Sequence, residues 1–160
     1  MILPQKIVLT KGIGQGSTSL NAFDSALLNA GVGNFNLVRV SSIVPPNSKI
    51  INLNTDSEDV LPAVGSIIPT VYSYLISNRP GEKISVVLGI ALPKNEKKNG
   101  LIFEYSCRGS FGQAKRNCRQ MIKEAAELRK MKIKKNFFVG NECIVGERYC
   151  CVIALALMLF

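Results

Sequence analysis

Two adjacent serines, Ser41 and Ser42, interrupt an apolar run that reads LVRVSSIVPP from Leu37 to Pro46. They stand where an extended strand normally carries bulky residues, and the two prolines end the run. The pair is consistent with a polar strand end, but it also has a chemical use. A serine hydroxyl can attack the carbonyl carbon of the preceding residue when the backbone is strained and the oxyanion is stabilised. Ser41-Ser42 is therefore a candidate self-cleavage site.

Cleavage of this kind makes a cofactor out of the chain itself. The ester that forms can eliminate across the Cα–Cβ bond of the second serine, and hydrolysis of the product leaves a ketone, a pyruvoyl group, on the new N-terminus. A protein ketone condenses with an amine and withdraws electrons from the bond to be broken. Ser-Ser pairs are frequent by chance, so the surrounding sequence has to support this hypothesis.

Two carboxylates are candidates for acid–base or binding roles. Glu104 lies inside the apolar segment Leu101–Tyr105, where it either alternates onto a solvent face or points into a cavity. In a cavity, desolvation would raise its pKa and make it a usable proton donor. Asp24 lies on a predicted short helix, where it is either an ordinary exposed residue or a carboxylate that binds a guanidinium in a bidentate pair.

The absence of histidine from the sequence excludes several kinds of site. Neither a Ser-His-Asp nor a Cys-His arrangement can be built, and histidine-based metal sites are excluded as well. The five cysteines form no CxxC pair, and their odd number argues against a disulfide framework. We therefore expect no metal site, and buried, reduced thiols.

The net charge of +9 is concentrated in one part of the chain. The segment from Arg108 to Lys135 holds ten of the twenty basic residues and only two acidic ones. Such a segment can contact nucleic acid, but no aromatic residues alternate with the charges as a stacking platform requires. A solvated helix face is the better interpretation, and we expect no nucleic-acid partner.

The chain termini indicate a protein that works inside the cell. The N-terminus has no basic leader followed by a long apolar core, so we expect no signal peptide. The apolar run Cys150–Phe160 has eleven residues, too few for a membrane-spanning helix, and a buried central strand explains it better. We therefore expect a cytoplasmic location and no membrane partner.

Periodicity and turn residues predict a single α+β domain of mixed, mainly antiparallel sheets with two helices. Strands are expected over 6–10, 34–41, 67–77, 84–92, 101–106, 137–145 and 149–160, and helices over 20–30, with Ser19 as N-cap, and 111–130. The glycines of 12–16 lack the third glycine and the downstream acid of a dinucleotide fingerprint, so a flexible connector is expected there. An irregular loop is expected over 47–65, including the acidic stretch 56–59. The regular spacing of 67–77, 84–92 and 101–106 favours an antiparallel meander.

Three blocks, taken in order, resemble the pyruvoyl-dependent arginine decarboxylases. They are LNAFDSALLNAGVGNFNLVRVSSIVPP over 20–46, PTVYSYLISNRPGEKIS over 69–85 and GLIFEYS over 100–106. The first block is highly specific and the other two support it. The resemblance implies cleavage between Ser41 and Ser42, which gives a β chain of residues 1–41 and an α chain of residues 42–160 headed by the pyruvoyl group.

The resemblance also implies roles for individual residues. Asn36 would assist processing, Glu104 would be the catalytic acid, and Asp24 would bind the guanidinium of the substrate. L-Arginine would form a Schiff base with the ketone derived from Ser42 and leave as agmatine and carbon dioxide, in polyamine biosynthesis. The implied fold is an αββα sandwich, assembled as a homotrimer or a dimer of trimers with active sites between protomers.

Two other functions remain open at this point. A pyruvoyl decarboxylase for another amino acid, such as histidine, would share the Ser-Ser processing site, although Asp24 favours a cationic substrate. A non-catalytic basic binding module that never cleaves would instead make use of the charged segment 108–135.

Overall fold

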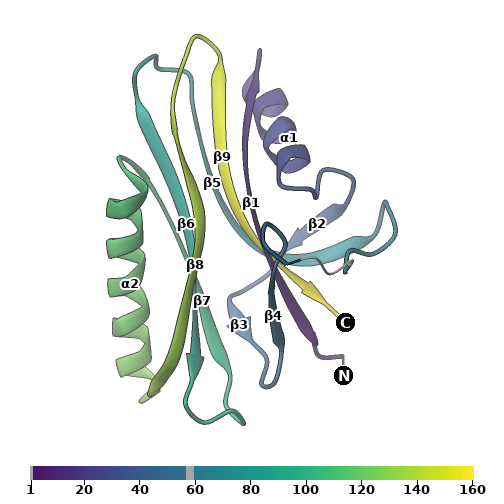
Figure 1. Cartoon of the computed structure of the whole chain (residues 1–160), viewed down its shortest axis with the longest axis vertical. Helices are drawn as coiled ribbons and strands as arrows, with labels where there is room; N and C mark the ends of the chain where they lie inside the picture. The colour runs from purple at the N-terminus through teal and green to yellow at the C-terminus, as the bar shows by residue number, and fades with distance from the viewer. Residues whose placement is uncertain (1, 57–59) are drawn as a thin grey trace.

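The computed structural model describes residues 2–56 and 60–160. Its elements form four layers, with two β-sheets packed face to face and one helix on the outer side of each (Figure 1). The elements are β1 (Lys6–Gly16), α1 (Ser19–Asn29), β2 (Asn36–Arg39), β3 (Ile43–Val44), β4 (Lys49–Asn52), β5 (Ile67–Ser77), β6 (Lys83–Pro93), β7 (Gly100–Arg108), α2 (Phe111–Leu128), β8 (Ile133–Ile144) and β9 (Tyr149–Leu159). The predicted αββα sandwich is confirmed.

The two sheets differ in their strand directions. The larger one, which we call sheet A, has the order β2-β5-β9-β1-β4 and is mixed, because β1 pairs with β4 and β2 pairs with β5 in parallel. The smaller one, sheet B, has the order β3-β7-β6-β8 and is antiparallel throughout. The segment 67–77 forms β5 as predicted, but it lies in sheet A between β2 and β9. The expected meander of three strands is therefore wrong, and only β6 and β7 pair with each other.

The apolar run at the C-terminus forms the central strand of sheet A. Its side chains alternate between two cores: Val152 and Ala154 face the core between the sheets, whereas Ile153 and Leu155 face the core beneath α1. A strand buried on both faces needs a continuous apolar sequence, which is why this stretch has no polar alternation. The prediction of a buried central strand is confirmed. Among the described residues, no helix is long and apolar enough to span a membrane.

The glycine-rich segment 12–16 is part of β1, so the prediction of a flexible connector is wrong. Helix α1 packs directly on these glycines: a Cβ atom on Gly12 would lie 2.1 Å from the Ala26 carbonyl oxygen, and one on Gly14 would lie 2.1 Å from the Ala26 amide nitrogen. The helix buries Ala22 and Ala26 against them, while Leu20 is 73% exposed. Small residues on both elements bring the helix close to the strand.

Several local predictions need smaller corrections. The N-cap of α1 is Thr18 rather than Ser19, because the Thr18 hydroxyl accepts a hydrogen bond from the Asn21 amide at 3.1 Å. The expected loop 47–65 contains β4, which pairs with the start of β1, and its residues 57–59 lie outside the described residues. Helix α2 ends at Leu128, two residues earlier than predicted, and Leu128 is exposed.

The cysteines do not all remain reduced. A disulfide joins Cys143 of β8 to Cys150 of β9. The expectation of reduced thiols is therefore wrong for these two cysteines. Cys107, Cys118 and Cys151 are free. Burial raises the pKa of the Cys118 and Cys151 thiols to about 12, so both stay protonated at neutral pH and are unsuited to act as nucleophiles.

Candidate active site

Ser41 and Ser42 lie in the short segment where the chain crosses from sheet A to sheet B. Neither residue belongs to a strand, so the predicted strand 34–41 ends earlier, at Arg39. The Val40 amide donates a hydrogen bond to the Thr70 carbonyl of sheet A at 3.2 Å, and the Ser42 carbonyl accepts one from the Ile102 amide of sheet B at 2.9 Å. The Ser41–Ser42 peptide bond is thus held between two anchored points.

The backbone at the serines is not left-handed. Among the described non-glycine residues, positive φ angles occur at Asn47 and Lys130 only. The strain that we considered for self-cleavage therefore has no support from a left-handed φ at Ser41 or Ser42. What this structure provides at the serines is anchoring on both sides of the bond.

A pocket of about 540 Å³ brings Ser41, Ser42 and Glu104 together. Ser41 is exposed and Ser42 is half-buried in this chain. The remaining lining is apolar except for one guanidinium at the end of α2, and it consists of Ile43, Leu101, Ile102, Phe103, Met121 and Arg129. Three of the residues predicted to take part in the chemistry therefore share one cavity.

Glu104 extends from the face of β7 that is turned toward sheet A. Its partner in the sheet register is Leu88, which belongs to the core between the sheets, and Ile102 on the same face of β7 belongs to that core too. The flanking Phe103 and Tyr105 pack instead beneath α2. The Glu104 side chain is 25% exposed. Of the two alternatives for this residue, the structure supports the carboxylate that points into a cavity.

Arg39 is a site residue that the sequence reasoning missed. Its Nη2 atom lies 3.3 Å from Oε1 of Glu104, and its guanidinium stacks over the Tyr72 ring, 5.3 Å from the ring centroid. The one signal in the sequence was a cation two residues before the serine pair, in an otherwise apolar strand. That signal does not reveal which carboxylate the cation meets, because Glu104 is 65 positions away along the chain.

Asn36 and Asp24 do not line this pocket in the single chain. The Asn36 side-chain amide donates a hydrogen bond to the Gly65 carbonyl at 2.8 Å, at the start of β2. Asp24 is exposed on α1. The ring of its neighbour Phe23 packs edge to face on the ring of Tyr74, with 4.8 Å between the two centroids. This contact fixes the helix against β5.

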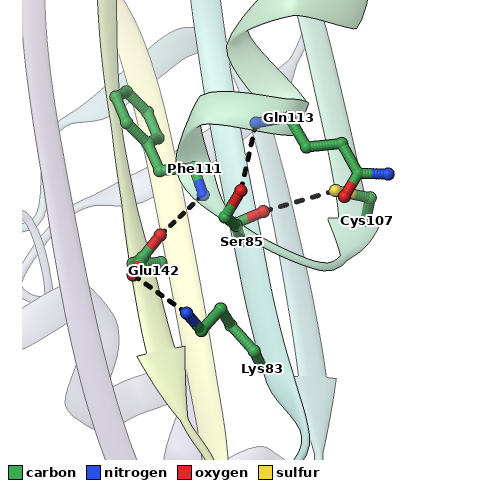
Figure 2. Close-up of polar contacts among 7 residues, drawn as sticks. Lys83, Ser85, Cys107, Phe111, Gln113 and Glu142 are labelled. Atoms are coloured by element: carbon green, nitrogen blue, oxygen red, sulfur yellow. Dashed lines mark hydrogen bonds and ion pairs between the residues drawn. The ribbon is translucent and has the colours of Figure 1, made fainter.

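A set of polar contacts holds the N-terminus of α2 on sheet B (Figure 2). The Glu142 carboxylate accepts a hydrogen bond from the Phe111 amide at 2.7 Å and lies 3.8 Å from the Lys83 ammonium. The buried Ser85 hydroxyl contacts the Cys107 sulfur at 3.4 Å. A carboxylate at a helix N-terminus satisfies a free amide and complements the helix dipole. These contacts orient the helix that supplies Met121 and Arg129 to the pocket.

A second pocket, of about 520 Å³, lies at another place on the sandwich and contains neither the serine pair nor Glu104. Its lining includes Lys98, Lys134 and Lys135, and the one carboxylate in it, Glu96, pairs with Lys134 at 2.6 Å. It holds none of the residues predicted to react, so it is not the candidate active site.

Comparison with known proteins shows which family this chain belongs to. The family model described as pyruvoyl-dependent arginine decarboxylase matches residues 6–160. The pyruvoyl-dependent arginine decarboxylase of Methanocaldococcus jannaschii is 41% identical over 97% of this chain and 90% of that protein. The proteins of the same name from Methanococcus vannielii and Pyrococcus furiosus are 39% and 35% identical, over 96% and 98% of this chain and 90% and 96% of those proteins. The chain belongs to the pyruvoyl-dependent arginine decarboxylase family.

Proposed function

We propose that this chain cleaves itself between Ser41 and Ser42 and then decarboxylates L-arginine to agmatine and carbon dioxide. The observation that carries the proposal is the single pocket lined by Ser41, Ser42 and Glu104. Family membership makes the protein a carboxy-lyase with a covalently bound pyruvoyl group. The comparisons do not support the two alternatives, a histidine decarboxylase and a non-catalytic basic module.

Self-cleavage needs only groups of the chain and one water molecule. The Ser42 hydroxyl attacks the Ser41 carbonyl carbon, and the peptide bond becomes an ester. Loss of the Ser42 α-proton then expels the Ser41 carboxylate, and water replaces the resulting enamine nitrogen, which leaves as ammonia. The anchors at Val40 and Ser42 support this assignment, because they limit the motion of the two reacting residues. Asn36 is proposed to assist the cleavage. It lies on β2, the strand that leads to the serine pair, and its side-chain amide donates a hydrogen bond to the Gly65 carbonyl in the uncleaved chain.

The residues around position 42 fit a pyruvoyl group. Ser42 lines the pocket, and its carbonyl oxygen is held by the Ile102 amide, so a ketone formed on its Cα would remain at the cavity. When present, the pyruvoyl ketone binds the substrate amine and accepts the electrons released with carbon dioxide. Glu104 is proposed to donate the proton that the substrate Cα then takes up.

Binding of the guanidinium is proposed for Asp24. Since Asp24 does not line the pocket of its own chain, this role requires that it reach the pocket of a neighbouring protomer. We therefore propose a homotrimer, or a dimer of trimers, with active sites between protomers. An exposed apolar side chain in the pocket lining supports an interface there, because Ile43 is 42% exposed in the single chain.

We also propose a cytoplasmic location and a role in polyamine biosynthesis. The Cys143–Cys150 disulfide is the observation against which the location has to be tested, because such bonds are uncommon in a reducing cytosol. Thiol titration of protein extracted under conditions that trap free cysteines would decide whether the bond forms in the cell.

One experiment tests the proposed function. Intact-mass analysis of the purified protein should find two chains, 1–41 and 42–160, with the larger one reactive toward borohydride. Carbon dioxide release is then compared for arginine, lysine and histidine, and arginine should give the highest kcat/KM. A chain that stays whole on prolonged incubation would overturn the enzyme assignment, whereas a cleaved chain that prefers histidine would overturn the substrate assignment alone.

A further inference from the structure

The Arg39–Glu104 ion pair joins the two halves of the chain across the cleavage point. Arg39 lies two residues before the Ser41–Ser42 bond, and Glu104 lies in the part that follows it. The Nη2 and Oε1 atoms are 3.3 Å apart. After cleavage the two residues would belong to different chains, so this contact would link the β chain to a carboxylate of the pocket.

The guanidinium in this pair is itself held in place. The Arg39 Cζ atom lies 5.3 Å from the centroid of the Tyr72 ring on β5. The Tyr72 ring in turn stacks with the Tyr74 ring, with 6.3 Å between the two centroids. A planar guanidinium can stack on an aromatic ring and still direct its N–H groups at a carboxylate, which a lysine ammonium cannot do with the same geometry. The Arg39 side chain that contacts the Glu104 carboxylate is thus itself oriented by the stacked rings of Tyr72 and Tyr74.

We propose that Arg39 is a positioning residue that holds the Glu104 carboxyl group toward position 42. The inference rests on the proposed function, because Glu104 matters in this way only if it serves the decarboxylation. A positioned proton donor has to stay within hydrogen-bond reach of the atom it serves, and a glutamate on the partly open edge of β7 has several rotamers available. The Arg39 contact selects among these rotamers.

The Arg39–Glu104 ion pair contributes little to the folding free energy. The Arg39 side chain is 58% exposed, and exposed ion pairs contribute from nothing to about 1 kcal/mol of folding free energy. Arg108 and Glu82 form a comparable pair at 2.9 Å, in which the arginine is 61% exposed, and Glu82 lines neither pocket. This second pair provides a matched control for the loss of an exposed arginine.

The test compares Arg39→Met, Arg39→Lys and Arg108→Met in the self-processed protein. Arg39→Met should cleave as the parent does, but its kcat for arginine should fall by about tenfold to a hundredfold. Arg39→Lys should recover part of the loss, and Arg108→Met should keep the parent kcat. In a Glu104→Gln background, Arg39→Met should cause no further fall in kcat, because the group it positions is gone. An equal fold-loss in both backgrounds, or an unchanged kcat in Arg39→Met, would overturn the inference.

A second measurement does not depend on activity. In the uncleaved Ser42→Ala chain, the guanidinium proton signals of Arg39 should show the slow exchange of a held group by NMR, and Glu104→Gln should abolish it. Arg39 signals that Glu104→Gln leaves unchanged would overturn the inference even if the parent enzyme is active. A parent protein that neither cleaves nor decarboxylates would overturn the proposed function instead, and the NMR comparison would still decide whether Arg39 holds Glu104.

Discussion

The carbonyl oxygen of Ser42 accepts a hydrogen bond from the Ile102 amide at 2.9 Å, and Ile102 lies two residues before Glu104 on β7. This one contact fixes the serine of the proposed cleavage site to the strand that carries the candidate proton donor. Alternate residues of a strand share a face, so Ile102 and Glu104 point the same way, into the space between the sheets. The distance between the two reactive positions is thus set by backbone structure, while the direction of the carboxylate is left to side-chain contacts.

Ser42→Ala should abolish self-cleavage, because it removes the attacking hydroxyl and keeps the backbone contacts of position 42. Intact-mass analysis should then find one chain of full length. Ser48→Ala is the matched control, since the Ser48 hydroxyl donates a hydrogen bond to the Pro4 carbonyl at 2.9 Å and lies outside the proposed cleavage site. Ser48→Ala should yield two chains; cleavage in Ser42→Ala would remove Ser42 from its proposed role.

Glu104→Gln should leave cleavage intact and lower kcat for arginine by about a hundredfold or more, the usual contribution of a positioned general acid. The amide keeps the size of the side chain but cannot donate an acidic proton. Product formation is followed as carbon dioxide release. Glu96→Gln is the control, because Glu96 pairs with Lys134 at 2.6 Å and does not line the pocket of the serine pair. A kcat equal to that of the parent in Glu104→Gln would assign the proton transfer to another group.

Much of the fold could be predicted from the sequence because it depends on local patterns. The three- and four-residue spacing of Phe111, Ala114 and Cys118 predicts α2, and the unbroken apolar run predicts β9. The partner of a strand is set by distant contacts, so the placement of β5 between β2 and β9 was missed. The glycine run 12–16 alone predicts a connector, because the helix that packs on it cannot be inferred from the glycines.

The site was predictable in its residue types and not in its contacts. The serine pair and Glu104 were identified from their types and their surroundings, and the structure brings them to one pocket. Arg39 was missed because its contact in the site is with Glu104, a carboxylate 65 residues away along the chain. Asp24 and Asn36 are proposed from a resemblance to a family, and neither residue lines the pocket of a single chain.

Gly14→Ala should destabilise the fold, because its new Cβ would lie 2.1 Å from the Ala26 amide nitrogen and 2.4 Å from the Ala22 carbonyl oxygen. Helix α1 would have to move away from β1. Overpacking of this kind costs about 1–3 kcal/mol of the free energy of unfolding. Urea unfolding of the uncleaved Ser42→Ala chain measures it. Gly146→Ala meets no atom within 4 Å and should leave the midpoint almost unchanged; equal midpoints for both variants would contradict the close packing.

Alkaline pH should weaken the fold through its two buried thiols. Burial raises the pKa of Cys118 and Cys151 from an ordinary value of 9.0 to about 12, so between these values the unfolded chain releases protons that the folded chain retains. Stability linked to these groups is complete below pH 9 and is lost as pH rises toward 12. Urea midpoints measured from pH 8 to pH 11 should fall. The fall, taken relative to each protein's own value at pH 8, should be smaller in Cys118→Ala; an identical pH dependence would show that this thiol does not contribute.

Asp24→Asn should weaken binding of arginine more than it slows the chemical step. Loss of a charged partner for a guanidinium costs about 1.5–3 kcal/mol of binding free energy, so KM should rise roughly tenfold to a hundredfold while kcat changes little. Asp56→Asn is the control, because the Asp56 carboxylate accepts a hydrogen bond from the Asn52 amide at 2.8 Å and lines neither pocket. A parent-like KM for Asp24→Asn would exclude the guanidinium role.

A mixed oligomer tests whether Asp24 serves a neighbouring pocket. Ser42→Ala protomers keep Asp24 but make no ketone, whereas Asp24→Asn protomers make the ketone but lack the carboxylate. If each site takes Asp24 from the adjacent protomer, co-assembly of the two variants creates sites that contain both groups, and a parent-like KM appears in part of the activity. If Asp24 serves its own chain, every active site in the mixture lacks the carboxylate, and the raised KM of Asp24→Asn alone remains.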